Sequence, residues 1–258
     1  MGVTEVARRV GFPKSLAFRI LISLTATGFL EKDAHARYRL GPRIVELGLA
    51  ALRSDELADA ALPQMQRLSD RTQETITLTL RVGYERTYVA QVTSRQEVRK
   101  TVRIGERYPL YAGNSGRAIL AWFSPHEVAE YFASVPLLPL TPSTICDRAA
   151  LEVSMAEVRR KGYAVSQGER DQWSAGVGAP IFDAYGHVTG ALSICAPIAR
   201  LEPRNCDLYG ELVSEAARAV TEAMGGQEPA EQARASRTPS TPWKKRTTSG
   251  GRGEGVRA

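Results

Sequence analysis

The sequence predicts an α+β protein with a small helical head, a larger body and a polar tail. In residues 3–24 apolar side chains recur at three- and four-residue steps, which is the spacing of a buried helix face. In residues 75–92 and again in 176–195 the pattern changes to alternating or short apolar runs bounded by turn residues, as in antiparallel strands. From residue 226 onward Pro, Ser, Thr, Gly and Arg dominate without periodicity, so we expect a disordered C-terminal tail.

The head is expected to hold two helices joined by a tight turn and followed by a short hairpin. Gly11 is placed to end the first helix, and Pro13 suits the first turn of the second, where its missing N–H costs nothing. Gly28 closes the second helix. A polar turn at 32–36 then separates two short arms within residues 29–40. This order of elements predicts a winged helix-turn-helix, whose second helix enters a major groove of DNA.

The second helix of the head presents a polar and basic outer face. Its predicted inward stripe consists of Ala17, Ile20, Leu21 and Leu24. The candidate DNA-binding residues of the helix and the wing are Lys14, Ser15, Phe18, Arg19, Ser23, Arg37 and Arg39. We expect Ser15 and Arg19 to reach bases or phosphates, and the other basic residues to hold the DNA backbone. The alternative is a helical hairpin packed into a larger core. Leu16 and Phe18 are apolar where a groove-facing helix is usually polar, so they either touch thymine methyl groups or pack on a neighbour.

The net charge of +6 is distributed unevenly along the chain. Residues 1–53 carry nine Lys and Arg against four Asp and Glu, a balance of +5, and residues 54–225 carry 18 against 21, a balance of −3. Residues 226–258 carry seven against three, a balance of +4. A basic head on a slightly acidic body indicates a nucleic-acid-binding module attached to a domain that binds a different partner.

Several classes of protein are excluded by what the sequence lacks. We find no secretory signal and no run of about 18 apolar residues, so we predict a cytoplasmic protein without a membrane partner. Cys146, Cys195 and Cys206 are odd in number and widely spaced, as is typical of reduced thiols. No ligand spacing indicates a metal, and Gly113 and Gly116 lack the lysine of a phosphate-binding loop. We therefore predict no cofactor, no metal, no catalytic residue and no enzyme.

Four segments are expected: a DNA-binding domain at 1–41, a linker helix at 42–54, a ligand-binding domain at 55–225 and the disordered tail at 226–258. In the helix expected at 55–71, Leu62 is placed inward and Pro63 is expected to kink or restart the helix. Leu208 is placed inward on the last helix. The other helices are expected at 117–123, 124–132, 149–161 and 203–224, and the strands at 75–82, 87–92, 98–104, 163–165, 176–182 and 188–195.

A ligand pocket is predicted where a loop meets a helix in the body. Asn114, Ser115 and Gly116 directly precede a helix, and free backbone N–H groups at a helix start bind carboxylates. Ser193 and Cys195 lie two apart on one strand, so both side chains face the same interior. The expected apolar walls are Leu110, Ile119 and Ile181. The alternative is that Ser193 is a hydrogen-bonded core hydroxyl; as a ligand contact, its replacement by Ala would cost about 1–3 kcal/mol of affinity.

From Val3 to about Met224 the chain resembles the IclR family of bacterial transcription regulators. The motifs that carry the resemblance are TEVARRVGFPKS, RYRLG, YPLYAGNSGRAILAW, LTPSTICDRAAL, RRKGYAVSQGERD and GAPIFDAYGHVTGALSICAP. The resemblance implies a winged-helix domain on double-stranded DNA, a GAF-like effector-binding domain, homodimers or dimers of dimers, and a small carboxylate or aromatic-acid effector. It places the effector contacts at Asn114, Ser115, Gly116, Asp171, Ser193 and Cys195, with the 169–173 loop nearby.

The sequence departs from the pattern of this family at two places. The family has a further helix before VTEVARR, so this winged helix-turn-helix is expected to lack its first helix. Either the coding start has been placed too late, or this protein has a weakened DNA-binding domain. Trp173 stands where similar sequences have a small residue, so its indole is expected to fill part of the pocket. We predict a ligand-responsive regulator on a palindromic operator. The alternative is a small-molecule-binding protein with a degenerate DNA-binding domain and no operator.

Overall fold

The computed structural model describes residues 1–44, 47 and 56–229 of the 258-residue chain. It divides into two compact units, Met1–Ala58 and Asp59–Ala258, and each is described here by itself. Most of the linker helix predicted at 42–54 lies outside the described residues, although 42–44 and 47 are helical.

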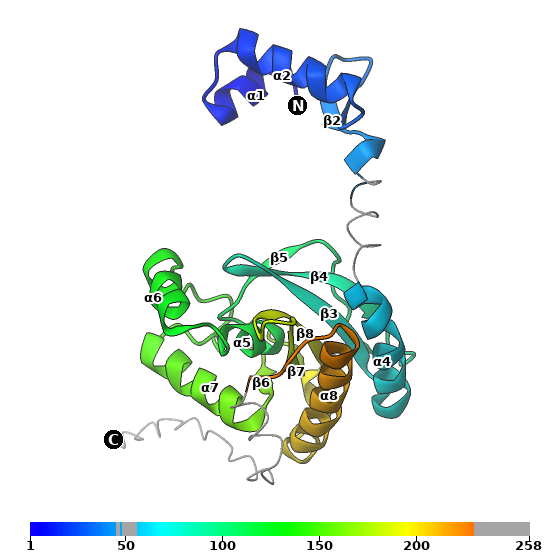
Figure 1. Ribbon diagram of the computed structural model, residues 1–258, viewed down its shortest axis with the longest axis vertical. Coiled ribbons are helices and arrows are strands. Elements are labelled where there is room, and N and C mark those ends of the chain that lie inside the picture. The colour runs from blue at the N-terminus through cyan, green and yellow to red at the C-terminus, as the bar shows by residue number, and fades with distance from the viewer. Residues whose placement is uncertain (45–46, 48–55, 230–258) are drawn as a thin grey trace, which may run out of the picture. The chain divides into compact units, whose positions relative to one another are not determined.

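The first unit has the two helices and the hairpin expected from the sequence (Figure 1). Its elements are α1 (Val3–Val10), α2 (Lys14–Ala26), β1 (Leu30–Lys32) and β2 (Tyr38–Leu40). Gly11 ends α1 in the left-handed conformation that favours glycine, with φ 68°. The strands β1 and β2 pair antiparallel, with Leu30 opposite Leu40. The prediction of a helix-turn-helix followed by a wing is confirmed.

The inward stripe of α2 is narrower than predicted. Ala17 and Leu21 are buried, but Ile20 is 39% exposed, so its inward placement was wrong. At 100° per residue Ile20 and Leu21 lie on opposite flanks of Ala17. The described parts of this unit pack mainly on the flank of Leu21.

The second unit is a six-stranded antiparallel sheet with helices on both faces. Its strands are β3 (Thr75–Val82), β4 (Glu85–Val92), β5 (Arg107–Pro109), β6 (Ala164–Gln167), β7 (Ser174–Phe182) and β8 (Val188–Pro197), in the spatial order β5-β4-β3-β8-β7-β6. Its helices are α4 (Glu56–Thr72), α5 (Asn114–Leu120), α6 (Pro125–Ser134), α7 (Arg148–Lys161) and α8 (Pro203–Ala223), with a 3-10 turn at Ile198–Arg200. The predicted α+β class is confirmed.

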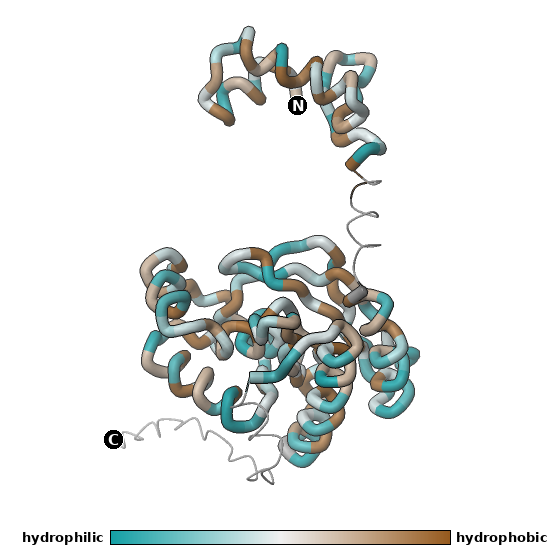
Figure 2. Tube along the Cα trace, in the orientation of Figure 1, coloured by the Kyte–Doolittle hydropathy of each residue, from teal (hydrophilic) through white to brown (hydrophobic). Residues whose placement is uncertain are grey.

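Helix α5 lies tightly against one face of β7. A Cβ on Gly178 would lie 2.6 Å from Ser193 Oγ and 3.3 Å from the Ser115 nitrogen, so glycine allows this close approach. Because side chains alternate along a strand, Val177 faces the opposite side, where α8 packs on β7 and β8. Figure 1 shows α4 beside α8, and α6 and α7 on the side of α5. Hydrophobic and hydrophilic residues alternate along these helices (Figure 2), and the sheet is buried between them.

The strand predicted at 98–104 is wrong. The structure has no strand there, and β5 forms later in the chain, with Arg107 opposite Thr87 of β4. Val98 and Ile104 are exposed, so the alternating pattern that predicted the strand does not mark a buried face. This segment instead carries Lys100 to the site described below.

Three details of the helices differ from expectation. Helix α5 begins at Asn114 rather than at 117, so the predicted loop forms its first turn. Pro63 lies inside α4, which continues as one helix and does not restart. Leu62 and Leu208 are exposed because each lies beyond the edge of the buried stripe of its amphipathic helix.

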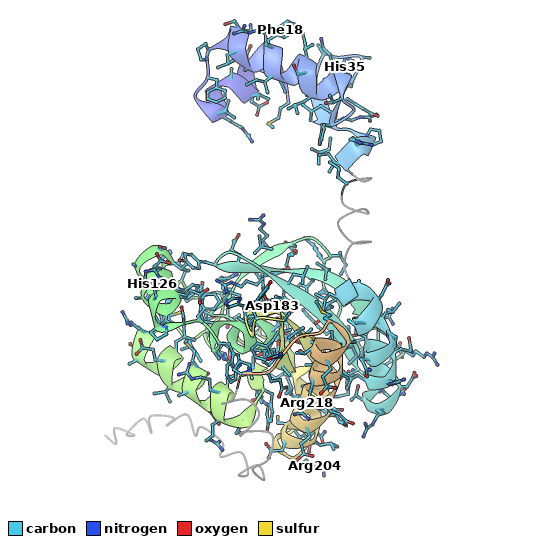
Figure 3. The ribbon with its side chains drawn as sticks, viewed as in Figure 1. Phe18, His35, His126, Asp183, Arg204 and Arg218 are labelled. Carbon is cyan, nitrogen blue, oxygen red and sulfur yellow. The ribbon has the colours of Figure 1, made fainter. Side chains whose placement is uncertain are left out.

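The disordered tail was predicted to begin too early. Gly226 N–H donates to Thr221 O at 2.7 Å, and Gln227 N–H donates to Asp183 O at 3.1 Å. Glu228 pairs with Arg218 of α8, with 3.3 Å between Nε and Oε1. Figure 3 shows Arg218 on α8 below Asp183. Residues 226–228 are therefore part of the packed domain, and the rest of the predicted tail, from 230, lies outside the described residues.

Candidate functional site

The exposed surface of α2 carries the predicted polar and basic side chains together with the apolar Phe18, Ile20 and Ile22. Lys14, Ser15, Arg19 and Ser23 are all exposed, and Phe18 is 44% exposed on the same side of the helix (Figure 3). In the part of the chain that the structure describes, no ion pair or hydrogen bond engages the side chains of Lys14 and Arg19. These two cations are available to a partner of opposite charge.

The two wing arginines are exposed but already have carboxylate partners. Arg39 Nη2 donates to Glu31 Oε2 at 2.6 Å across β1 and β2, and Arg37 Nε lies 3.7 Å from Asp33 Oδ2. The backbone N–H groups of Arg37 and His35 lower the pKa of Asp33, which keeps this carboxylate charged. A phosphate would compete with these carboxylates for the arginines, so Arg19 and Lys14 present the freer charges. All seven predicted DNA contacts are exposed, and their role stays a prediction.

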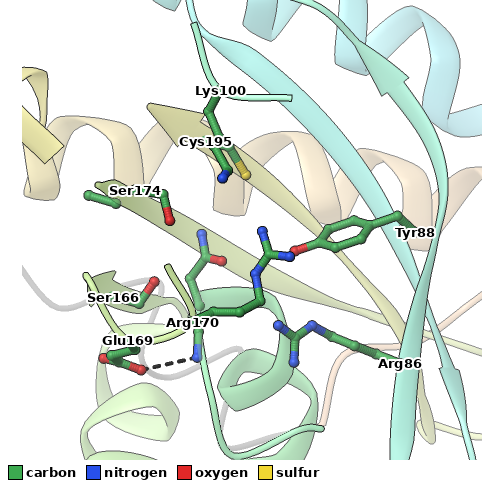
Figure 4. A pocket seen from close by; sticks show the side chains of 11 residues that line it. Arg86, Tyr88, Lys100, Ser166, Glu169, Arg170, Ser174 and Cys195 are labelled. Carbon is green, nitrogen blue, oxygen red and sulfur yellow. Dashed lines mark hydrogen bonds between the residues drawn. The ribbon is translucent and has the colours of Figure 1, made fainter. Parts of the chain in front are cut away.

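A polar cavity lies in the second unit between the sheet and the start of α5 (Figure 4). The empty space between its lining atoms, counted together with adjoining open solvent, is about 340 Å³. The lining residues come from β4, the 98–104 segment, α5, β6, β7, β8 and the loop after β6: Arg86, Tyr88, Lys100, Gly113, Asn114, Ser166, Glu169, Arg170, Ser174, Ala175 and Cys195. The sheet order brings these elements together from distant parts of the sequence.

Backbone N–H groups at the start of α5 already have acceptors within the protein, one of which is a carboxylate. Glu169 Oε2 accepts a hydrogen bond from the Gly113 N–H at 3.0 Å and forms a buried ion pair with Arg117. The Ser115 N–H donates to Asn114 Oδ1 at 2.7 Å. Of the three N–H groups predicted to be free for a ligand carboxylate, that of Ser115 is taken by the Asn114 side chain, and the preceding Gly113 N–H is taken by Glu169.

The six effector contacts implied by sequence are only partly brought together. Asn114 and Cys195 line the cavity. Asp171 stands just outside, where it pairs with Lys100. Ser115 and Ser193 are fully buried with Oγ atoms that lack a hydrogen-bond partner, and neither lines the cavity. Gly116 and the three predicted apolar walls, Leu110, Ile119 and Ile181, are buried, and none of them lines the cavity. Their roles as contacts stay predictions.

The indole of Trp173 does not fill the pocket. Trp173 is 71% exposed and is absent from the cavity lining, so this expectation was wrong. Its backbone N–H donates to Asp171 Oδ1 at 3.0 Å, which fixes a turn that directs the side chain outward.

Sequence reasoning missed the cations of the cavity, Arg86, Lys100 and Arg170. Arg86 is fully buried, and its guanidinium donates to the carbonyl oxygens of Pro109 and Ala112, the latter at 2.8 Å. Its Nε has no hydrogen-bond partner. A single arginine in the apolar alternation of β4 was the available signal, because a charged residue at a buried strand position needs a compensating partner.

The aromatic side chains of the cavity hold Arg170 in place. The Arg170 guanidinium lies 4.4 Å from the ring centroid of Tyr108 and 5.4 Å from that of Tyr88. Burial lowers the pKa of Arg86, and the charge of Arg170 acts in the same direction. The Lys100 ammonium, in turn, holds the pKa of Asp171 below its usual value. The cavity is thus an electropositive site with repulsion between its two arginines.

The thiol in the cavity is not built as a nucleophile. Cys195 Sγ lies 3.7 Å from Thr77 Oγ1, and burial raises the pKa of this thiol, which keeps it protonated. Among the described residues there is no group of three His, Cys, Asp or Glu side chains that could hold a metal ion. None of the described helices is long and apolar enough to cross a membrane.

A helix-turn-helix unit combined with a cavity on an antiparallel sheet is the architecture of a ligand-responsive DNA-binding regulator. Residues 1–34 match the family model of the IclR helix-turn-helix domain, and residues 49–222 match that of the bacterial transcriptional regulator IclR C-terminal. The chain belongs to the IclR family, whose members are transcription regulators and not enzymes. The alternative, a binding protein with a degenerate DNA-binding domain, is not favoured by these matches.

Curated relatives match along most of their length. The HTH-type transcriptional regulator KipR of Bacillus subtilis is 31% identical over 223 residues, which are 86% of this chain and 89% of KipR. The HTH-type transcriptional regulator KdgR of Escherichia coli is 31% identical over 226 residues, 87% of this chain and 86% of KdgR.

Solved structures share the fold. A crystal structure described as an IclR transcriptional regulator from Silicibacter sp. TM1040 is 33% identical with a TM-score of 0.81, over 90% of this chain and 91% of that one. An IclR homologue from Microbacterium hydrocarbonoxydans, crystallised with 4-hydroxybenzoate, is 29% identical with a TM-score of 0.72, over 87% and 91%.

Proposed function

We propose that this regulator binds a small organic acid in the cavity between α5 and the sheet, and that the bound acid changes the affinity of α2 for its operator. The observation that carries the proposal is the pair of cavity arginines, Arg86 and Arg170, neither of which has a carboxylate partner among the described residues. A buried cation without a counter-ion is unfavourable, and an organic anion would supply one. The relative crystallised with 4-hydroxybenzoate holds such an acid.

The DNA partner is a palindromic operator in the cytoplasm, bound by a homodimer or a dimer of dimers. One chain presents one recognition helix, α2, whose short exposed face reads only one half-site. Two-fold symmetric proteins read two such half-sites about one helical turn apart, roughly 34–36 Å, which requires a second copy of the chain. Arg19 and Ser15 contact bases or phosphates, and the basic residues of the wing contact the backbone.

Each of the proposed segments has its own role. Residues 1–41 bind DNA, residues 55–225 bind the acid through Asn114, Cys195 and the cavity cations, and the linker at 42–54 connects them. Binding of the acid biases the arrangement of the DNA-binding heads by no more than its differential affinity for the two states.

A thermal-shift titration with benzoate and 4-hydroxybenzoate tests the proposal. A ligand at a hundred times its Kd stabilises the folded state by about 2.7 kcal/mol, so a bound acid raises Tm measurably. Glucose, a neutral polar molecule, serves as the control. The same acids are then added to a gel-shift titration with the DNA upstream of the gene. A Tm that rises without any change in DNA affinity would refute the coupling, and a Tm indifferent to every organic acid would refute the site.

A further inference from the structure

The charges around the cavity do not balance. Four cations lie in or against it, Arg86, Lys100, Arg117 and Arg170, and they face two carboxylates. Glu169 is held by Arg117, and Asp171, the other carboxylate, is held by Lys100. Among the described residues no carboxylate forms an ion pair with Arg86 or Arg170, although the charge of Asp171 also acts on Arg170, so the cations outnumber the carboxylates by two.

Arg86 carries one buried N–H that no acceptor among the described residues engages. Its side chain is fully buried, and two of its nitrogens are fixed by backbone carbonyl groups while Nε has no partner. The amide of Asn114 lies nearby in the same lining, is nine-tenths buried, and has an Nδ2 that also lacks a partner. Unpaired buried donors are costly, and two of them in one cavity indicate a missing acceptor.

Arg170 supplies the second charge from a different element. Its guanidinium carbon lies 4.4 Å from the ring centroid of Tyr108 and 5.4 Å from that of Tyr88, and no carboxylate among the described residues forms an ion pair with it. Figure 4 shows the cations spread along the cavity, with Lys100 beside Cys195 at one end, Arg86 at the other and Arg170 between them. Separated cations fit two separated anionic groups better than a single compact one.

We propose, on the basis of the function proposed above, that the acid recognised by this cavity is a dicarboxylate. One carboxylate accepts from Arg86 Nε and the Asn114 amide, and the other accepts from the N–H edges of Arg170. Both interactions relieve the repulsion between the two guanidinium groups. A monocarboxylate leaves one arginine uncompensated and binds more weakly.

Isothermal titration calorimetry of the full chain at pH 7.5 and fixed salt compares matched acids. The pairs are glutarate with butyrate and terephthalate with benzoate, and phenyl phosphate tests a dianion whose charge is concentrated on one group. We expect each dicarboxylate to bind at least about ten-fold tighter than its monocarboxylate, which corresponds to about 1.4 kcal/mol. Equal affinities within each pair would overturn the dicarboxylate assignment while leaving the organic-acid site standing. Tighter binding of phenyl phosphate than of terephthalate would overturn it as well.

The variant Arg170→Gln carries the residue-level test, because Arg170 is only half-buried and its replacement leaves the core intact. It is expected to reduce the ratio of dicarboxylate to monocarboxylate affinity toward one, because it removes the cation that pairs with the second carboxylate. Arg103→Gln, at an exposed arginine outside the cavity, is the matched control and is expected to keep the preference. A preference that survives in Arg170→Gln would overturn the assignment. No heat with any of the five probes would instead count against both the dicarboxylate and the proposed organic-acid site.

Discussion

Arg117 and Glu169 form a buried ion pair that fastens the start of α5 to the loop between β6 and β7. Both side chains are nearly inaccessible, at 3% and 8% exposure, and Glu169 also accepts from the Gly113 N–H. Arg117 donates in addition to the Val165 carbonyl oxygen of β6. This pair fixes one wall of the cavity and consumes the carboxylate that would otherwise neutralise the cavity arginines.

Glu169→Gln is expected to lower the free energy of unfolding by about 3–5 kcal/mol, because it leaves the Arg117 charge buried without its counter-ion. Urea denaturation followed by circular dichroism measures the loss. Glu152→Gln, which breaks the exposed Arg148–Glu152 pair within α7, is expected to change stability by about 0.5 kcal/mol or less. Equal losses in the two variants would show that the buried pair has no special role.

Arg19→Ala is expected to weaken operator binding at least several-fold, since a base-specific arginine contact contributes about 1–3 kcal/mol. A gel-shift titration at fixed salt measures the change. Arg103→Ala, in the other unit, should bind DNA as wild type does. Unchanged affinity in Arg19→Ala would remove this residue from the interface.

Stability toward acid is expected to depend on Asp171, whose pKa is lowered chiefly by Lys100. A carboxyl group with a lowered folded-state pKa stabilises the fold above its unfolded pKa of about 3.9, and this contribution is lost as the pH falls through the folded value. Asp171→Asn should therefore unfold at lower urea than wild type at pH 7, and the difference should shrink as the pH falls below about 3.9. The exposed Asp59→Asn is the control, and a difference that stays constant as the pH falls below about 3.9 would contradict the account.

Asn114 lines the cavity and Ser193 does not, so the two residues are expected to differ as ligand contacts. Asn114→Ala is expected to weaken terephthalate binding by about 1–3 kcal/mol, because it removes a buried donor from the lining. Ser193→Ala is expected to have a smaller effect, since its Oγ faces Gly178 outside the cavity lining. Calorimetry measures the terephthalate affinity of both variants. A loss of affinity in Ser193→Ala as large as that in Asn114→Ala would support the ligand contact predicted from sequence.

Truncation distinguishes the packed residues 226–228 from the segment that follows. Removal of residues 230–258 is expected to leave Tm within about 2 °C of the full chain, because that composition offers little apolar surface to bury. Removal from Gly226 onward deletes the contacts with Thr221, Asp183 and Arg218, and should lower Tm by roughly 2–4 °C or more. A large drop with the shorter truncation would mean that the distal segment docks.

Local sequence patterns predicted most of the helices and strands. They did not predict the cavity cations, which come from distant parts of the sequence and meet only in the folded sheet. The hairpin of β3 and β4 and the helix α7, with Asp147 as its N-cap and Gly162 after its end, follow from turn and cap residues that act within a few positions. The cavity cations escaped because Arg86, Lys100 and Arg170 lie up to 84 positions apart and meet only through the sheet order. No local period encodes such a meeting.

The most direct test of the account is the affinity of the full chain for its upstream DNA with and without the dicarboxylate that binds tightest, measured by fluorescence anisotropy. The account predicts that this acid changes the Kd for DNA in wild type and in Arg103→Gln, and that the change is lost in Arg170→Gln although its Kd without acid equals that of wild type. An identical response in Arg170→Gln, or a wild-type Kd that the bound acid leaves unchanged, would contradict it.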